Sequence, residues 1–327
     1  MKPALTQADI AAATAGMTGF ADPVSGADHL NLLRRLYAIG REDLPLGRLV
    51  EGHVDALQIV HRYGTPEQAT EAARAARKGR VFGVWNADRP GDATRLEGAL
   101  LFGSKAFASG AGLVTDALIS VDAPAGRQLL LLDLEAAVPA IDRGWWQVTG
   151  MARSQTHIAT WSAQPVAEQA WIGAPGDYVR EPWFSGGALR FAAVQAGGIA
   201  GLCTLARDHL VAADRSADPF QSARLADLYR HAQAATDAVR TAAQGWAVED
   251  SEATIARVAA ARVAVYAAGE AVLALAAAAV GVTAMFADDP VSEHMRDLDT
   301  YLRQPGPDAQ RLLAGRAVAE RRLVPAL

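Results

Sequence analysis

The sequence changes character twice along its length, and this division constrains the fold more than any single motif. Apolar residues recur at helical spacing through residues 1–80 and again from 185 to 327. Residues 81–184 instead hold short β-rich runs about ten residues apart, separated by turn residues. No helical pattern lies between those runs, so the strands are expected to pair antiparallel, in a sandwich or barrel. We therefore predict an α+β fold with an N-terminal helical domain (1–80), a middle antiparallel β-domain (81–184) and a C-terminal helical bundle (185–327).

Capping and breaking residues mark the expected helix ends. Asp28 is a candidate N-cap for one N-terminal helix. Gly64 is expected to end the next helix, and Thr65 with Pro66 to start a third. Prolines and glycines divide the C-terminal block into five expected helices, at about 186–213, 219–247, 250–281, 288–303 and 307–321.

Composition excludes several classes of protein. The chain of 327 residues is 51% hydrophobic with a net charge of −5, which excludes dominant disorder and lacks the basic excess of a nucleic-acid binder. Cys203 is the single cysteine, so no intramolecular disulfide or cysteine-rich zinc site can form. The seven histidines show no HxH or HExxH spacing, and no metal site is expected. A reducing, cytoplasmic location fits this cysteine usage.

The longest uncharged apolar run, residues 271–287, raises the question of a membrane span. It is slightly short for one and is rich in alanine rather than leucine. We interpret it as a buried helix inside the bundle. The N-terminus has no compact apolar run and does not resemble a signal peptide, so no membrane partner is expected.

The order of the blocks and five short motifs resemble the acyl-CoA dehydrogenase superfamily. In that family a helical domain, a β-domain and a C-terminal four-helix bundle follow one another. The similar motifs, in chain order, are His61–Gln68, Gly103–Gly110, Gly150–Thr156, Ala196–Gly201 and Pro290–Asp297. The resemblance spans roughly residues 40–325 and rests on the order and spacing of the motifs rather than on any one of them.

This resemblance implies FAD between the β-domain and the bundle, where the flavin supplies the redox chemistry and a glutamate removes a proton. Four residues match positions at the flavin: Trp85, Asn86, Phe107 and Ser109. Three match positions at a substrate pocket: Arg190, Tyr301 and Gln304.

The sequence departs from the family at the catalytic glutamate. One family position for it falls at about Pro305, and the other falls in the carboxylate-free stretch 187–193. Asp299 and Asp308 are the acids nearest the first position, and Asp308 is interpreted as a favourable charge at a helix N-terminus.

The motifs that hold the adenine half of FAD are also reduced. One is shortened to Asp218–Gln221. The other, at 278–284, keeps only Gly281 of its closely spaced glycines, which let backbone amides approach phosphate oxygens.

Two classes of function therefore remain open. The first is an acyl-CoA dehydrogenase-like flavoprotein oxidoreductase that lacks the usual glutamate and acts on a non-standard small-molecule or acyl substrate. The second is a non-catalytic member with weak or no FAD binding that serves as a binding or assembly protein. A homodimer or homotetramer is expected in both cases, because the family assembles through its bundle.

Overall fold

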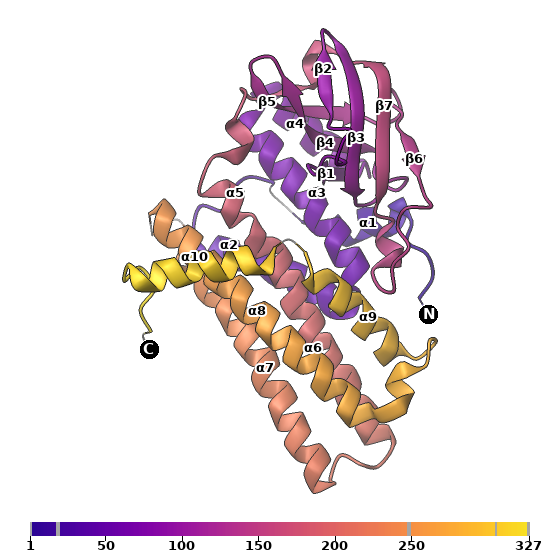
Figure 1. Ribbon diagram of the computed structural model, residues 1–327, viewed down its shortest axis with the longest axis vertical. Helices are drawn as coiled ribbons and strands as arrows, with labels where there is room; N and C mark the ends of the chain where they lie inside the picture. The colour runs from indigo at the N-terminus through magenta and orange to yellow at the C-terminus, as the bar shows by residue number, and fades with distance from the viewer. Residues whose placement is uncertain (1, 18–19, 247–249, 305, 326–327) are drawn as a thin grey trace.

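The computed structural model describes residues 2–17, 20–246, 250–304 and 306–325. The helices are α1 (Gln7–Thr14), α2 (Gly26–Glu42), α3 (Leu44–Tyr63), α4 (Pro66–Arg77), α5 (Trp183–Gly186), α6 (Ala188–Ala212), α7 (Pro219–Gln244), α8 (Ser251–Val280), α9 (Pro290–Leu302) and α10 (Pro307–Ala319). The strands are β1 (Phe82–Trp85), β2 (Arg95–Glu97), β3 (Leu100–Ala108), β4 (Asp116–Ala123), β5 (Gly126–Asp133), β6 (Ala140–Asp142), β7 (His157–Pro165) and β8 (Trp171–Ile172). Four short 3-10 turns complete the elements: η1 (Ala152–Ser154), η2 (Glu168–Ala170), η3 (Asp177–Val179) and η4 (Gly281–Met285). The sheet lies at one end of the molecule, the long helices α6, α7 and α8 extend from the other, and α3 runs between them (Figure 1).

Side-chain caps set the helix starts, with one correction to the sequence-based assignment. Ser25, and not Asp28, is the N-cap of α2, because the Ser25 hydroxyl accepts the Asp28 backbone N–H at 3.1 Å. Asp28 is the third helical residue, and its carboxylate accepts the backbone N–H of Val24. The start of α4 is confirmed: Thr65 and Gln68 cap each other's backbone reciprocally, and Gly64 ends α3.

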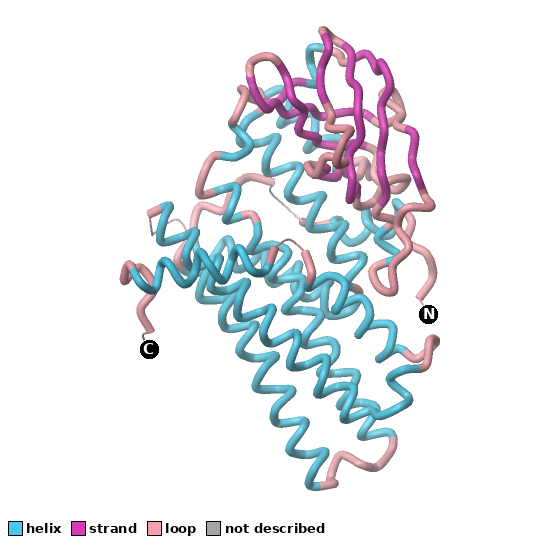
Figure 2. The backbone as a smooth tube through the Cα atoms, viewed as in Figure 1, coloured by secondary structure: helices cyan, strands magenta, loops and turns pink. Residues whose placement is uncertain are grey.

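The eight strands of the described residues form one sheet in the order β6-β7-β3-β2-β4-β5-β8, with β1 alongside β4. The strands, drawn in magenta, gather at one end of the molecule (Figure 2). The predicted antiparallel pairing is found for β2–β3, β3–β7, β4–β5, β5–β8 and β6–β7. It is wrong for β1, which pairs with β4 in parallel, and for a single parallel contact between β2 and β4. The chain leaves β1, forms the β2–β3 hairpin, and returns to β4 in the same direction, which makes the β1–β4 pair parallel.

The predicted burial of residues 271–287 is only partly correct. Ala276 and Ala279 on α8 are buried, whereas Val282 and Phe286 beyond its end are exposed. The helical stretches Trp183–Ala212 and Ser251–Met285 are long and apolar enough to cross a membrane by composition, with 67% and 39% of their most apolar windows buried. The first is therefore mostly a core helix. The second stretch, Ser251–Met285, has an apolar face that the described residues of this chain leave partly exposed.

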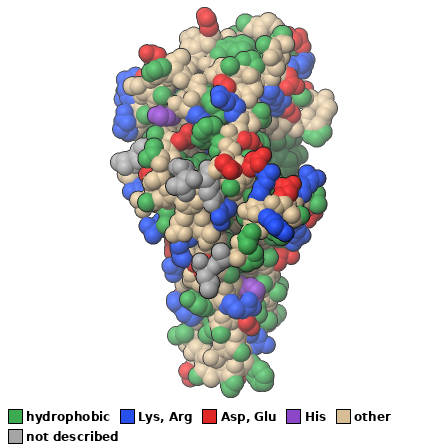
Figure 3. Space-filling view, turned by 90° about the vertical axis from the view of Figure 1, so that its left-hand side faces the viewer, with side chains coloured by type: hydrophobic (Ala, Val, Ile, Leu, Met, Phe, Trp, Pro, Cys, Tyr) green, Lys and Arg blue, Asp and Glu red, His purple; other side chains and the backbone are tan. Residues whose placement is uncertain are grey.

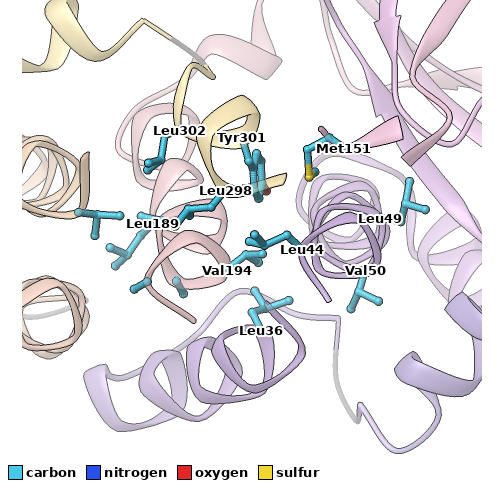
Figure 4. Close-up of a cluster of buried hydrophobic side chains, with 14 of the residues drawn as sticks. Leu36, Leu44, Leu49, Val50, Met151, Leu189, Val194, Leu298, Tyr301 and Leu302 are labelled. Atoms are coloured by element: carbon cyan, nitrogen blue, oxygen red, sulfur yellow. The ribbon is translucent and has the colours of Figure 1, made fainter. Parts of the chain in front are cut away.

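One continuous hydrophobic core joins the three sequence blocks. At its centre Leu36 of α2, Leu44 of α3, Val194 of α6 and Leu298 of α9 lie between the four helices (Figure 4). Most residues of α3 are buried, since this helix contacts the sheet on one side and α2, α6 and α9 on the other.

Two of the motifs that carry the family resemblance meet in space. The backbone N–H of Met151 donates to the Asp297 carboxylate, which joins the loop before β7 to α9. Burial raises the pKa of Asp297 to about 6. Gly150 packs so closely against α9 that a Cβ there would lie 1.8 Å from the Arg296 carbonyl oxygen.

We predict that Gly150→Ala lowers the free energy of unfolding by about 3 kcal/mol, because the atoms in its way belong to backbone that must shift. Urea unfolding monitored by tryptophan fluorescence measures the change. Gly315→Ala on α10 is the matched control. Its added Cβ meets no atom within 4 Å, and the helix should gain about 0.5 kcal/mol. Equal stability of Gly150→Ala and the native protein would contradict the packing described.

Candidate functional site

A cleft of about 770 Å³ opens between the sheet, α3 and α9, and we name it the main cleft. Its volume lies within the range of small-molecule and cofactor sites. Helix α3 contributes Arg48, Glu51 and Asp55, and α6 contributes Phe191. The remaining lining residues come from the end of β1 and the loop after it, from β3, from two loops, and from the end of α9: Val84, Asn86, Ala87, Phe107, Trp146, Tyr178, Asp299, Thr300, Tyr301, Arg303 and Gln304.

A polar stripe runs along α3, and three of its members, Arg48, Glu51 and Asp55, form the charged wall of this cleft. Its members recur three and four residues apart, which places them on one face of the helix. They are Arg48, Glu51, Asp55, Gln58 and Arg62. Every other position nearby on α3 is apolar, glycine or histidine, and most are buried. Arg48, Glu51 and Asp55 therefore face the main cleft, and Arg62 faces a second cavity beside it. The rest of the helix faces the core.

Arg190 of α6 holds the stripe together. Its guanidinium donates to Gln58 Oε1 at 2.8 Å and to the Asp55 carboxylate, and its Nε lies 3.7 Å from Glu51 Oε1. Arg48 donates to Glu51 Oε2 at 2.7 Å. Two carboxylates one turn apart thus lie between two arginines, and the four formal charges cancel.

Burial governs the titration of this group. It raises the pKa of Glu51, and the neighbouring Asp55 charge raises it further, while Arg48 and Arg190 act in the opposite direction. Burial also raises the pKa of Tyr301, whose hydroxyl has no hydrogen-bond partner. The cleft wall therefore combines a carboxyl group that binds protons more readily than usual with a neutral phenol.

The sheet forms the opposite wall. Asn86 follows β1 and donates from its amide nitrogen to the Tyr178 hydroxyl, while its amide oxygen is buried without a partner. Phe107 on β3 is half exposed and contacts Trp145 edge to face, at 4.8 Å between ring centroids. Trp146, stacked on Trp145, lines the cleft and donates its indole N–H to the Met151 carbonyl oxygen at 3.2 Å. This wall is aromatic and carries one amide with free acceptor capacity.

The four residues predicted at the flavin are divided between two layers. Asn86 and Phe107 line the main cleft. Trp85 is buried behind it, and its indole N–H donates to the Ser109 carbonyl oxygen at 2.9 Å. The Ser109 hydroxyl accepts from Thr156 and borders a crevice of about 10 Å³ rather than the main cleft.

The three residues predicted at the substrate pocket are divided between two cavities. Tyr301 and Gln304 line the main cleft, as does Asp299. Arg190 lines a second cavity of about 440 Å³, which we name the side chamber. Glu51 and Asp55 border both cavities, so the carboxylates mark the junction between them. Pro305 lies outside the described residues.

Sequence reasoning missed Arg48, Glu51 and Asp55. The two family positions for a carboxylate lie on the bundle, whereas Glu51 and Asp55 reach the cleft from the N-terminal block. Asp299, an acid near the first family position, also lines the cleft. The three- and four-residue spacing of polar side chains within an otherwise apolar helix is the signal that would have identified them.

The segments compared with the adenine-binding motifs lie far from the cleft. Asp218–Gln221 starts α7 and Gly281 ends α8, both at the end of the bundle opposite the sheet (Figure 1). Among the described residues, no group of three or more His, Cys, Asp or Glu side chains is arranged to hold a metal ion.

Comparisons with known proteins identify the fold. No family model matches the sequence, and no curated protein matches it by sequence. Solved structures are similar across most of the chain. TdsC from Paenibacillus sp. A11-2, in complex with FMN and indole, has a TM-score of 0.78 at 18% identity, over 92% of this chain and 85% of its own.

Two further structures are similar to a comparable degree. Butyryl-CoA dehydrogenase from Megasphaera elsdenii has a TM-score of 0.76 at 15% identity, covering 89% of this chain and 82% of its own. The FAD complex of PigA has a TM-score of 0.78 at 15% identity, covering 97% and 91%. The acyl-CoA dehydrogenase-like fold predicted from the motifs is therefore confirmed, and the low identities fit a divergent chain.

We predict that Arg190→Gln lowers the free energy of unfolding by about 3 kcal/mol, because it leaves Asp55 without its buried cationic partner. Thermal and urea unfolding measure the loss. Arg74→Gln is the control, since the Arg74–Glu71 pair lies on the surface and should contribute no more than about 0.5 kcal/mol. Similar small losses in both variants would show that the pairing of Arg190 with α3 does not stabilise the fold.

Proposed function

We propose that this chain is a flavin-dependent oxidoreductase that acts on a small molecule in the main cleft. The observation that carries the proposal is the cleft itself: about 770 Å³ between the sheet and α9, with an aromatic wall. Two residues that line it, Asn86 and Tyr301, each hold a buried polar atom that none of the described residues satisfies. In native structures buried polar atoms are nearly always hydrogen-bonded, so unpaired ones beside a cavity support a ligand site. Solved structures of the same fold contain FMN or FAD.

The residues present fit the ring half of a flavin. Phe107 and Trp146 offer aromatic surface to a planar ring, and Asn86, which lines the same cleft, has an amide oxygen that none of the described residues satisfies. Tyr301 and Gln304 offer polar contacts from the α9 side of the same cleft. A bound flavin supplies hydride and electron transfer.

The fit to the adenine half is weaker. None of the described residues that line the main cleft is a glycine, and Gly281 is remote from it. FAD is the cofactor expected from the family resemblance. FMN, which lacks the adenine, requires fewer of the contacts that this chain has lost.

The chain's own side chains have three tasks in this proposal. The aromatic wall of Phe107 and Trp146 excludes water from the ring. Arg48 and Arg190 fix the carboxylates at the junction of the two cavities. The side chamber gives a small substrate a route to the main cleft, past Trp183 and Phe184.

The alternative is a non-catalytic binding or assembly protein of the same fold with weak or no FAD binding. The reduced adenine motifs favour it, because tight FAD binding needs closely spaced glycines near the phosphates. The absorbance test below distinguishes the two functions.

We also propose a homodimer or homotetramer and a cytoplasmic location. Exposed apolar side chains at the end of the bundle support self-assembly: Val211, Phe220, Val282, Met285 and Phe286. Basic and acidic side chains are interspersed over the face seen in Figure 3, which supports partners other than nucleic acid.

We predict that the purified protein is yellow, or becomes yellow on incubation with flavin, and shows a flavin absorbance band. Mass measurement of the released cofactor then identifies FAD or FMN. A colourless protein that takes up neither cofactor would contradict the proposed function and favour the binding or assembly protein.

Phe107→Ala should weaken flavin binding about 3- to 10-fold through the lost aromatic contact. Phe102→Ala, on the same strand but outside the cleft, is the matched control.

We predict no appreciable acyl-CoA dehydrogenase activity, at least 100-fold below that of an enzyme with a positioned base. The stretch 187–193 carries no carboxylate, and the cleft acids of α3 lie elsewhere in the fold. Dye reduction with saturated acyl-CoA substrates of several lengths measures it. Chemical reduction of the flavin, followed by its reoxidation by the same dye, is the control. Normal turnover would show that our assignment of the missing base is wrong.

A further inference from the structure

The two cleft carboxylates differ in how they are bound. Asp55 accepts a charge-assisted hydrogen bond from the Arg190 guanidinium. Glu51 accepts one hydrogen bond, from Arg48 to Oε2. Its other oxygen, Oε1, accepts no hydrogen bond from the described residues and has Arg190 Nε only at 3.7 Å. Glu51 therefore keeps one oxygen available to a ligand.

Glu51 is well placed to use that oxygen. Its side chain is 6% exposed, yet it lines both the main cleft and the side chamber. Glu51 therefore lies on the boundary that the two cavities share. Arg190 lines the side chamber and Tyr301 lines the main cleft. The Arg190 Nε and the Tyr301 hydroxyl have no hydrogen-bond partner among the described residues.

We propose that Glu51 exchanges a proton with the ligand bound in the main cleft. This inference rests on the proposed function, because the ligand is the flavin or the substrate beside it. In one direction an N–H or O–H bond of the ligand breaks, its electron pair stays on the ligand atom, and the proton forms a bond with Oε1. The return step reverses this and restores the carboxylate.

The surrounding charges suit this task. Asp55 on α3 lies one turn away and disfavours a second negative charge, whereas Arg48 on α3 and Arg190 on α6 favour it. Tyr301 on α9 contributes a neutral phenol, since burial raises its pKa. Burial adds to the effect of Asp55 and raises the pKa of Glu51. A carboxyl group whose two forms are closer in energy near neutral pH is the more efficient acid or base.

A purely structural role for Glu51 makes a different prediction. As a fixed ion-pair partner of Arg48 it would stay ionised at every pH at which the protein is folded. The substitution Glu51→Gln keeps the shape of the side chain, and the amide oxygen can still accept from Arg48. This variant should therefore fold while losing the titrating group, and thermal unfolding verifies that it does.

The first test is infrared spectroscopy across pH, on the protein as purified. We expect the native protein to lose a carboxylic-acid C=O band at a pH above the ordinary glutamate value of about 4.3, because burial and Asp55 raise the pKa of Glu51. The part of this band that belongs to Glu51 should be lost in Glu51→Gln and should persist in Glu71→Gln, a control that removes an exposed glutamate of α4. The band of Asp297, whose pKa burial raises to about 6, should remain in both variants. Asp55→Asn should move the transition to lower pH, because it removes the negative neighbour. A band that is absent, or unchanged in Glu51→Gln, would overturn the proposal.

The second test couples Glu51 to the ligand. Reduction of a bound flavin changes the charge in the cleft, and by linkage this shifts the pKa of any group that feels it. The midpoint potential of the bound flavin should therefore change its slope against pH near the infrared transition in the native protein. That break should disappear in Glu51→Gln and remain in Glu71→Gln.

The outcomes separate the two proposals. If flavin binds but the slope has no break that depends on Glu51, the inference is wrong and the proposed function stands. If neither FAD nor FMN binds, the absorbance spectrum shows that the proposed function fails, and the inference falls with it. A break that Glu51→Asp restores at a shifted pH would confirm that a carboxyl group at this position is responsible.

Discussion

The fold depends on the burial of α3. This helix contacts β1 of the sheet and the helices α1, α2, α4, α6 and α9, so most of its residues are buried. A helix buried in this way would normally be apolar all round. The polar stripe on α3 therefore needs partners inside the protein, and the structure provides them through Arg190 of α6. That requirement fixes how the N-terminal block sits against the bundle.

The same constraint creates the cleft. Charged groups on α3 cannot pack against apolar side chains of the sheet or of α9 without losing hydration, which is costly for ionised groups. A cavity between these elements keeps Glu51 and Asp55 at a polar boundary while their neighbours on α3 remain in the core. The contact of Met151 with Asp297 holds the loop before β7 against α9 and so maintains the separation of the two walls.

The sequence predicts the parts of this architecture that local chemistry controls. Gly64, Thr65 and Pro66 mark a helix boundary because capping depends on neighbouring residues alone. The parallel pairing of β1 with β4 depends on residues more than thirty positions apart, and no turn signal encodes it. In the site, the motifs predicted four residues at the flavin, and Asn86 and Phe107 do line the cleft. The motifs could not show that Trp85 and Ser109 lie in the layer behind it. Glu51 was missed because it lies outside every family position, although its spacing to Arg48 and Asp55 is visible in the printed sequence.

Stability alone does not explain the ionised stripe. A buried ion-pair network usually gains less from attraction than it loses in hydration, and well-packed apolar replacements are often neutral or stabilising by about 1 to 4 kcal/mol. An all-apolar α3 would also have closed the cleft and joined the two sides of the core. A pair of carboxylates held between Arg48 and Arg190, at the junction of two cavities, is costly to maintain and is placed where a ligand would meet it. This combination of cost and position is the strongest physical reason to assign the stripe a chemical role rather than a structural one.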